Sequence, residues 1–265
     1  MPFTTGLEGK VVLITGGSGG IGRAVASAMA AQGARLAICG RDELRLQETV
    51  DELRAGPRAD IISVKANMTK LNDIRRFVGA AMSKFGRIDI LVNNAGGLHV
   101  GGILQTSEED LEYHIQLKLL GYIRASREVI EHMKASGGGK IINIIGMAGR
   151  EPGPLSLLPG VINAALLNFT KSLSKELEGD RITVNSVNPG AADTPLAEEA
   201  FKSIGALSQK SPEEVRLRAA SSTKLGRIAS PGDVANAVLF LASEAASFIN
   251  GTSINVDAGE SLGIW

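Results

Sequence analysis

Short apolar segments alternate along the chain with longer amphipathic segments. An apolar segment with no polar face is typical of a strand buried on both sides, as in a parallel sheet covered by helices. The predicted strands are Lys10–Thr15, Arg35–Cys39, Ile61–Lys65, Ile88–Val92, Lys140–Ile145, Ile182–Val187 and Ser253–Val256. The predicted helices are Gly20–Gln32, Asp42–Leu53, Leu71–Lys84, Glu108–Ala135, Gly160–Leu177 and Pro231–Ser243. This alternation predicts an α/β fold: a doubly wound parallel sheet (Rossmann fold) in three α/β/α layers.

The domain organisation follows from the length and from one irregular segment. A chain of 265 residues is within the range of a single α/β domain, so we expect one nucleotide-binding domain over residues 1–265. The segment Ala191–Leu225 is long and has no strand pattern. We expect it to form a small helical flap over the carboxyl edge of the sheet.

Charge and cysteine content narrow the classes of partner. Lys+Arg and Asp+Glu are both 28, and this balance gives no support to binding of nucleic acid or a membrane surface. The single cysteine, Cys39, cannot form an internal disulfide, which fits a reducing compartment. No segment approaches the ~20 apolar residues that span a bilayer, and Met1–Gly9 has no secretory apolar stretch. We therefore expect a soluble cytoplasmic protein, and no metal site is predicted.

A glycine-rich turn joins the first predicted strand to the first predicted helix. Glycine permits the sharp turn and lets a diphosphate approach the backbone, while the helix N-terminus offers free N–H groups. Such a turn can also be a mere connection, but its place between a strand and a helix favours a nucleotide site. The residues assigned to this site are Gly16, Ser18, Gly19, Gly20, Ile21 and Gly22.

The end of the second predicted strand carries Gly40 and Arg41. A carboxylate at this place binds the ribose 2′-hydroxyl of NAD, whereas an arginine suits the 2′-phosphate of NADP. Asp42 comes one residue late and is better explained as a helix cap. The sequence therefore predicts NADP(H) as cofactor, the alternative being that Arg41 is a solvated surface residue.

Further motifs resemble the short-chain dehydrogenase/reductase family. Besides Thr15–Gly22, they are Asn93–Gly96, Pro189-Gly190 with Thr194, Leu225–Arg227 and Val256–Gly259, and the resemblance covers residues 7–262. It implies a nicotinamide dinucleotide cofactor, hydride transfer at a carbonyl or alcohol carbon, and commonly a homotetramer. The cofactor-binding residues it adds are Asn67, Met68, Asn94, Ala95, Gly96, Lys118, Asn163, Pro189, Gly190 and Thr194.

The catalytic positions of the family do not match this chain. In the register of the resemblance, the catalytic serine is replaced by Gly146, the tyrosine by Pro159, the lysine by Asn163 and the asparagine by Lys118. The only two tyrosines, Tyr113 and Tyr122, lie in the long predicted helix, where we expect them to pack against neighbouring helices or a subunit. The usual general acid is therefore absent.

Three residues are the candidates for the missing chemistry. Lys118 can bind the cofactor ribose or polarise a carbonyl oxygen, and the alternative is that it only hydrogen-bonds backbone or cofactor groups. Asn163 keeps hydrogen-bonding capacity without charge. His99, just after Asn93–Gly96, can shuttle protons or be an ordinary loop residue in contact with solvent.

These residues predict an NADP(H)-dependent oxidoreductase that acts on a small apolar carbonyl or alcohol substrate by a non-standard proton transfer. Two alternatives stay open: a nucleotide-binding pseudoenzyme, and a non-redox enzyme on the same fold. An apolar substrate is indicated by Leu155, Leu157, Leu158, Val161 and the flap. The apolar helix after Asn163 predicts a homo-oligomer, a tetramer or a dimer.

Overall fold

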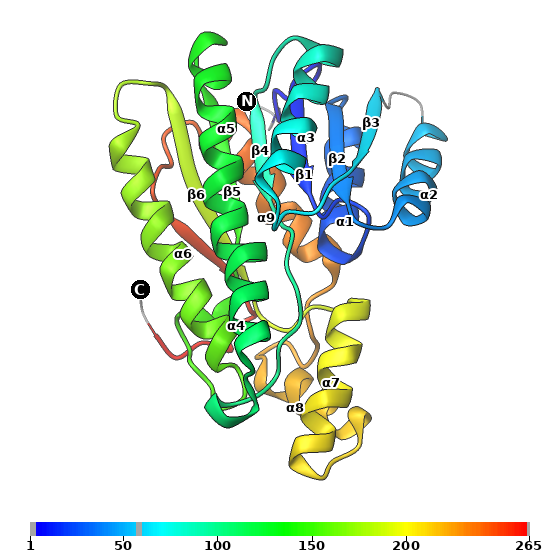
Figure 1. The fold of residues 1–265 in the computed structure, drawn as a ribbon. Coiled ribbons are helices and arrows are strands. Elements are labelled where there is room, and N and C mark those ends of the chain that lie inside the picture. The colour runs from blue at the N-terminus through cyan, green and yellow to red at the C-terminus, as the bar shows by residue number, and fades with distance from the viewer. Residues whose placement is uncertain (1–3, 57–59, 264–265) are drawn as a thin grey trace.

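The computed structural model describes residues 4–56 and 60–263 and is built around a seven-stranded parallel sheet (Figure 1). The strand order is β3-β2-β1-β4-β5-β6-β7. The strands are β1 Val11–Thr15, β2 Arg35–Gly40, β3 Ile61–Lys65, β4 Ile90–Asn93, β5 Gly139–Ile144, β6 Ile182–Pro189 and β7 Ser253–Val256. The doubly wound α/β fold predicted from the sequence is confirmed.

Helices cover both faces of this sheet. The helices are α1 Gly20–Ala31, α2 Glu43–Arg54, α3 Leu71–Phe85, α4 Glu108–His114, α5 Gly121–Ala135, α6 Leu157–Glu176, α7 Pro195–Ser208, α8 Pro212–Ser222 and α9 Pro231–Ala242. Residues of α1, α2 and α9 share one core cluster with the sheet, and residues of α3, α5 and α6 share another on the opposite face. The result is the expected three-layer arrangement.

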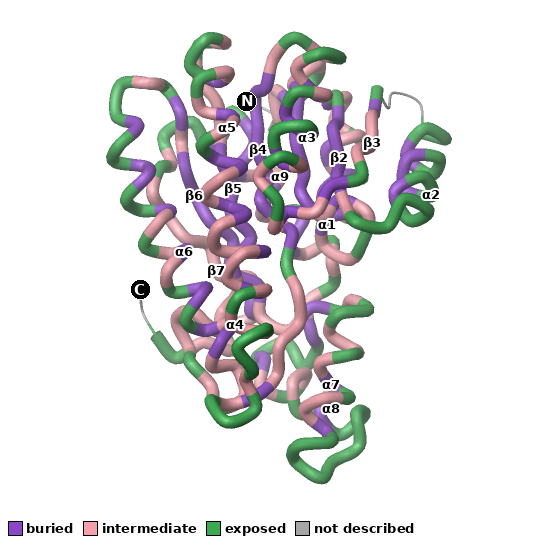
Figure 2. The backbone as a smooth tube through the Cα atoms, viewed as in Figure 1, coloured by how far each residue is buried: buried purple, intermediate pink, exposed green. Residues whose placement is uncertain are grey.

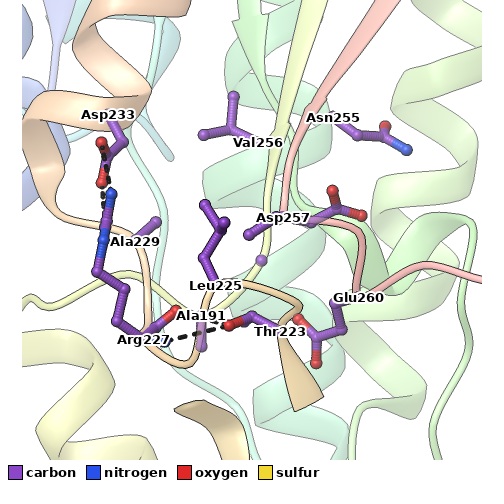
Figure 3. A pocket seen from close by; sticks show the side chains of 12 residues that line it. Ala191, Thr223, Leu225, Arg227, Ala229, Asp233, Asn255, Val256, Asp257 and Glu260 are labelled. Carbon is purple, nitrogen blue, oxygen red and sulfur yellow. Dashed lines mark hydrogen bonds and ion pairs between the residues drawn. The ribbon is translucent and has the colours of Figure 1, made fainter. Parts of the chain in front are cut away.

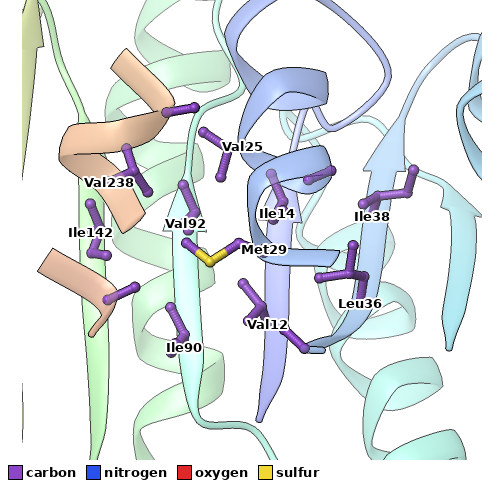
Figure 4. Close-up of a cluster of buried hydrophobic side chains, with 14 of the residues drawn as sticks. Val12, Ile14, Val25, Met29, Leu36, Ile38, Ile90, Val92, Ile142 and Val238 are labelled. Carbon is purple, nitrogen blue, oxygen red and sulfur yellow. The ribbon is translucent and has the colours of Figure 1, made fainter. Parts of the chain in front are cut away.

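Alternating side chains of β1 supply both cores. Val12 and Ile14 pack with α1 and α9 (Figure 4). Val11 and Leu13 pack on the opposite face. Successive side chains of a strand point to opposite faces, so a strand covered on both sides must be apolar throughout. Figure 2 shows this buried backbone concentrated in the central strands. The apolar pattern of Lys10–Thr15 therefore reflects a strand that is covered by helices on both faces, as the sequence indicated.

The long helix predicted over Glu108–Ala135 is interrupted. It consists of α4, a π-helical turn over Ile115–Leu120, and α5. π-Helical turns occur mostly as short insertions in α-helices, frequently at functional sites. Hydrophobic periodicity cannot reveal such a turn, because one extra residue leaves the apolar pattern readable on both sides.

A buried polar network ties the middle of the sheet to two helices. Asn93 Nδ2 donates to Asn143 Oδ1 at 2.9 Å and to Ser126 Oγ at 3.2 Å. Asn143 Nδ2 donates to Thr170 Oγ1 at 2.9 Å. These four residues lie on β4, β5, α5 and α6, so the network fixes the helices that flank the end of β5.

The segment predicted as a helical flap contains α7 and α8, which lie beyond the carboxyl edge of the sheet (Figure 1). They share a small apolar cluster of their own, formed by Phe201, Val215 and Ile228. Among the described residues, no helix has the length and apolar character needed to cross a membrane.

Replacing Asn143 by alanine should lower the free energy of unfolding by about 2–3 kcal/mol, because two hydrogen bonds are lost and their buried partners stay unsatisfied. Urea denaturation of the wild type and the variant measures this difference. Ser172→Ala, on the exposed side of α6, is the control and should change stability by less than about 0.5 kcal/mol. Equal stabilities of Asn143→Ala and wild type would show that the network is not important for the fold.

Candidate active site at the carboxyl edge of the sheet

The glycine-rich turn after β1 is packed too closely for side chains. A Cβ atom on Gly22 would lie 2.1 Å from the Gly16 carbonyl oxygen. A Cβ atom on Gly16, whose φ is +67°, would lie 3.0 Å from the Cα atom of Ala95. Glycine is therefore required here by contact between β1, α1 and the segment after β4. The positive φ of Gly16 agrees with the sharp turn expected from the sequence, whereas the approach of a diphosphate to this backbone stays a prediction.

Thr15 and Asn94 hold this turn against the end of β4. The Thr15 hydroxyl accepts hydrogen bonds from the backbone N–H groups of Asn94 and Ala95, at 2.9 and 3.0 Å. Asn94 Nδ2 donates to the carbonyl oxygens of Thr15 and Gly16, both at 3.0 Å. The predicted cofactor residue Asn94 thus shapes the crevice between β1 and β4, and a direct contact between its side chain and a cofactor stays a prediction.

The N-terminus of α1 faces open space. Gly19 is its N-cap residue and provides no side-chain hydrogen bond, and a Cβ atom there would meet nothing within 4 Å. Gly20 lies against the side chain of Thr194, which caps α7 by accepting from Ala197 N. The flap therefore begins beside the glycine-rich turn, and the free N–H groups of α1 point to the place where a diphosphate would bind.

The end of β2 lies next to Ser18 and is followed by Arg41. Arg41 is exposed, and a Cβ atom on Gly40 would lie 2.8 Å from Ser18 Oγ. Asp42 caps α2 by accepting from Arg45 N at 3.2 Å, which confirms the helix-cap interpretation. Ser18, Gly40 and Arg41 thus border one small region next to the glycine-rich turn.

The predicted adenine-binding pair lies after β3. Asn67 Oδ1 accepts hydrogen bonds from Thr69 N and Thr69 Oγ1, both at 3.0 Å. Met68 is buried, with Cys39 Sγ at 3.8 Å from its sulfur. Burial raises the pKa of the Cys39 thiol to about 12, so this cysteine is not a nucleophile. Asn67 and Met68 thus support the turn after β3, and their contact with adenine stays a prediction.

The remaining predicted cofactor residues border the same edge. Ile21 packs partly against the core, Ala95 is buried, and Gly96 follows it. Pro189 ends β6, and Gly190 N donates to Val256 O at 3.1 Å. These positions belong to neighbouring carboxyl ends, where ligands of open α/β sheets bind.

Lys118 and Asn163 form the polar centre of the site. Lys118, in the π-helical turn, donates to the carbonyl oxygen of Ile145 and to Asn163 Oδ1, the latter at 2.9 Å. Asn163 Nδ2 lies 3.5 Å from the carbonyl oxygen of Gly146. Burial lowers the pKa of the Lys118 ammonium from 10.5 to about 8. Both residues were candidates from the sequence, and the structure places their side chains in direct contact.

The backbone at Gly146 and at Pro159 suits the residue found there. Gly146 has φ +118°, a conformation that residues with a Cβ atom rarely adopt. Pro159 is the third residue of α6, where its missing N–H is tolerated because the first turn of a helix leaves that group unpaired. Helix α6 begins at Leu157, so the predicted start at Gly160 was three residues late.

His99 lies in the loop after β4, with its Nε2 atom 3.9 Å from Asp110 Oδ2, and within the part of the chain that the structure describes it makes no hydrogen bond to Lys118 or Asn163. Its side chain is 6 % exposed, and its ring lies edge-on to that of His114 at 5.7 Å. His99 Nδ1 is buried and has no hydrogen-bond partner among the described residues. The loop after His99 is joined to the loop before α6, where Gly101 N donates to Leu155 O. His99 therefore lies in a loop as expected, but its buried side chain contradicts the expected contact with solvent, and a role as proton shuttle stays a prediction.

The two tyrosines make contacts that periodicity could not reveal. Tyr122 is buried and donates to the carbonyl oxygen of Ile144 at 2.8 Å. Tyr113 accepts a hydrogen bond from Arg41 Nη1 at 2.6 Å, across 72 residues of sequence. The expectation that both tyrosines pack against neighbouring helices or a subunit did not include this link to the residue after β2. No local signal carries it, because the two residues meet only once the sheet has formed.

A cavity of about 200 Å³ opens at the ends of β6 and β7 (Figure 3). Leu225 and Val256 line it, and the ion pair between Arg227 and Asp233 lies at its side. Gly190 also lines the cavity, which is therefore continuous with the predicted cofactor edge. Two of the apolar residues expected to contact substrate do not line this cavity: Leu158 is buried in a core cluster, whereas Val161 is exposed.

Comparison with known proteins gives a consistent result over almost the whole chain. Residues 16–261 match the family model described as enoyl-(acyl carrier protein) reductase. The chain is 34 % identical to 3-oxoacyl-[acyl-carrier-protein] reductase FabG of Thermotoga maritima, covering 96 % of this chain and 98 % of that protein.

Two solved structures are similar as well. The L-sorbose reductase of Gluconobacter frateurii, complexed with NADPH and L-sorbose, superposes with a TM-score of 0.93 at 31 % identity, covering 99 % of this chain and all of that one. A 3-ketoacyl-(acyl-carrier-protein) reductase of Brucella melitensis, complexed with NADH, gives a TM-score of 0.85 at 31 % identity, covering 97 % and 100 %. With the glycine-rich turn and the crevice beside it, these matches show that the chain belongs to the short-chain dehydrogenase/reductase family of oxidoreductases.

Proposed function

We propose that the protein is an NADP(H)-dependent oxidoreductase acting on a small apolar carbonyl or alcohol substrate. The observation that carries the proposal is the pairing of the free N-terminus of α1 with an exposed arginine at the end of β2. The first is suited to a diphosphate and the second to a ribose 2′-phosphate.

The chain's own residues fit such a dinucleotide. Gly16 and Gly22 let β1, α1 and the segment after β4 pack closely together, and Gly19 leaves open space at the start of α1, where the diphosphate is proposed to bind. The Arg41 guanidinium and the Ser18 hydroxyl are the groups proposed to bind the 2′-phosphate. The related sorbose reductase is complexed with NADPH and the related ketoacyl reductase with NADH, so the family alone does not decide between them. Arg41 is the reason for proposing NADP(H).

Lys118 is the residue we propose for proton transfer or charge stabilisation. When bound, the cofactor supplies or accepts the hydride. The register of the family resemblance leaves Gly146 and Pro159 where a serine and a tyrosine are expected, and neither has a side-chain proton to give. Lys118 uses two donors on Ile145 O and Asn163 Oδ1, which leaves its third ammonium proton free to bind a substrate oxygen. Its lowered pKa near 8 suits proton transfer close to neutral pH.

The substrate is proposed to lie between the loop before α6 and the flap. Leu196 and Leu207 on α7 expose apolar surface, and Leu155 lies in the loop before α6, where its carbonyl oxygen accepts a hydrogen bond from Gly101 N. Apolar side chains in these two segments favour an apolar molecule. We also propose a homo-oligomer, supported by Val161, which exposes 64 % of its surface on the outer side of α6.

A nucleotide-binding protein without redox activity is the second candidate. It is favoured by the observation that Lys118 has internal acceptors and can serve to anchor α6 to the end of β5. Tight NADPH binding without turnover of any carbonyl compound distinguishes this function from the first.

Arg41→Ala should weaken NADPH binding by about 10–100-fold, because a charged hydrogen bond to the 2′-phosphate is lost. NADH affinity should change by less than about twofold, and fluorescence titration of both cofactors measures the two effects. Arg45→Ala removes another exposed cation nearby and should leave both affinities unchanged. Equal wild-type affinity for NADPH and NADH would contradict the assignment.

Gly146→Ser should not restore a family-type active site. The positive φ makes any Cβ at this position strained, at a cost of about 1–3 kcal/mol, and the new atom would lie 3.2 Å from Asn163 Nδ2. Chemical denaturation should show this loss, while the control Gly79→Ala, in α3 with open space around it, should gain about 0.5–1 kcal/mol. A Gly146→Ser variant as stable as wild type and more active would refute this account of the site.

Lys118→Met should lower turnover by about 100-fold, the scale for deleting one electrostatic stabiliser, with a much smaller effect on NADPH binding. In the direction of carbonyl reduction, kcat/KM of the wild type should fall as the pH rises through about 8, where the ammonium loses its proton. Lys118→Arg keeps the charge and should move this decline to higher pH. Unchanged turnover in Lys118→Met would remove the residue from the mechanism.

A further inference from the structure

Arg41 is held in place by Tyr113. Arg41 Nη1 lies 2.6 Å from the tyrosine hydroxyl, and the guanidinium carbon is 5.9 Å from the centre of the tyrosine ring. Arg41 follows the last residue of β2, and Tyr113 lies in the last turn of α4. One contact therefore joins the predicted 2′-phosphate position to the helix that leads into the π-helical turn.

Tyr113 is itself fixed by its neighbours. Its ring lies edge-on to the buried ring of His114, with centroids 5.1 Å apart. The His114 ring is in turn packed against Gly97, where a Cβ atom would lie 2.9 Å away. Helix α4 is anchored at its start by a capping box between Ser107 and Asp110. The hydroxyl that receives Arg41 thus has a defined position.

The chemistry of the contact leaves Arg41 available for an anion. The tyrosine oxygen is a neutral acceptor and occupies one of the five guanidinium N–H donors, so the positive charge and four donors remain. Other exposed arginines pair with carboxylates, as Arg45 does with Asp42 and Arg76 with Asp73. Within residues 4–56 and 60–263, Arg41 forms no ion pair with a carboxylate.

We propose that Tyr113 is a positioning residue that orients Arg41 toward the ribose 2′-phosphate and so contributes to selectivity for NADP(H) over NAD(H). The inference rests on the proposed function of Arg41. A free arginine side chain has many rotamers, and immobilising it on binding lowers affinity. A guanidinium already held by a hydroxyl and an aromatic ring loses less freedom when the phosphate arrives.

The test is the dissociation constants of NADPH and NADH for wild type, Tyr113→Phe, Arg41→Ala and the double variant. Phenylalanine keeps the ring against His114 and removes only the hydroxyl. We expect Tyr113→Phe to weaken NADPH binding by about 3–10-fold, the scale of one hydrogen bond, and to leave NADH unchanged. In the Arg41→Ala background the same substitution should have no effect on NADPH. Tyr122→Phe makes the same chemical change at a buried site and should leave the ratio of the two affinities unaltered.

Each outcome has a distinct meaning. Equal affinity of the wild type for both cofactors would overturn the proposed function of Arg41 and this inference with it. A wild type that prefers NADPH, and loses the preference in Arg41→Ala but not in Tyr113→Phe, would overturn the inference alone. Tighter NADPH binding by Tyr113→Phe would also overturn it, since Tyr113 would then hold Arg41 away from the phosphate.

Discussion

The site depends on the contact between the end of β1 and the end of β4. These strands are neighbours in the sheet, but the chain leaves them in opposite directions, toward β2 and toward β5. Such a switch point opens a crevice at the carboxyl edge. At the base of this crevice, the Thr15 hydroxyl and the Asn94 side-chain amide join the ends of β1 and β4 by four hydrogen bonds. Gly22 allows the first turn of α1 to pack against the Gly16 carbonyl oxygen. Without this contact the N-terminus of α1 would not face the crevice.

The second half of the site is a polar centre built around a lysine. The π-helical turn presents Lys118 toward the end of β5, where it bridges Ile145 and Asn163. Gly146 follows Ile145 and has a positive φ, which suits glycine. Glycine has no hydroxyl, and a serine at this position would be strained. In the register of the family resemblance, Lys118 lies in the region where the serine and the tyrosine would be expected, and we propose that the long cation takes their place. We propose that Lys118 supplies the proton near the reacting oxygen in place of a tyrosine.

Most of the fold could be predicted from the sequence, because buried parallel strands and amphipathic helices have distinct patterns. The glycine-rich turn could be assigned too, since Gly16 and Gly22 serve close backbone approach, which only glycine allows. Lys118 and Asn163 were found through the register of the family resemblance, and their mutual contact then appeared in the structure. The π-helical turn and the link from Arg41 to Tyr113 were not predictable. The first leaves periodicity intact, and the second joins residues 72 positions apart.

The central claim is that this site transfers hydride between NADPH and an apolar carbonyl compound without a tyrosine acid. The most direct measurement is mixing of stoichiometric protein and NADPH with a panel of such compounds, followed by the near-ultraviolet absorbance of NADPH and by identification of the alcohol formed. The account predicts loss of NADPH and an equal amount of alcohol for at least one compound. Bound NADPH that stays reduced with every compound, together with bound NADP that oxidises none of the corresponding alcohols, would contradict it.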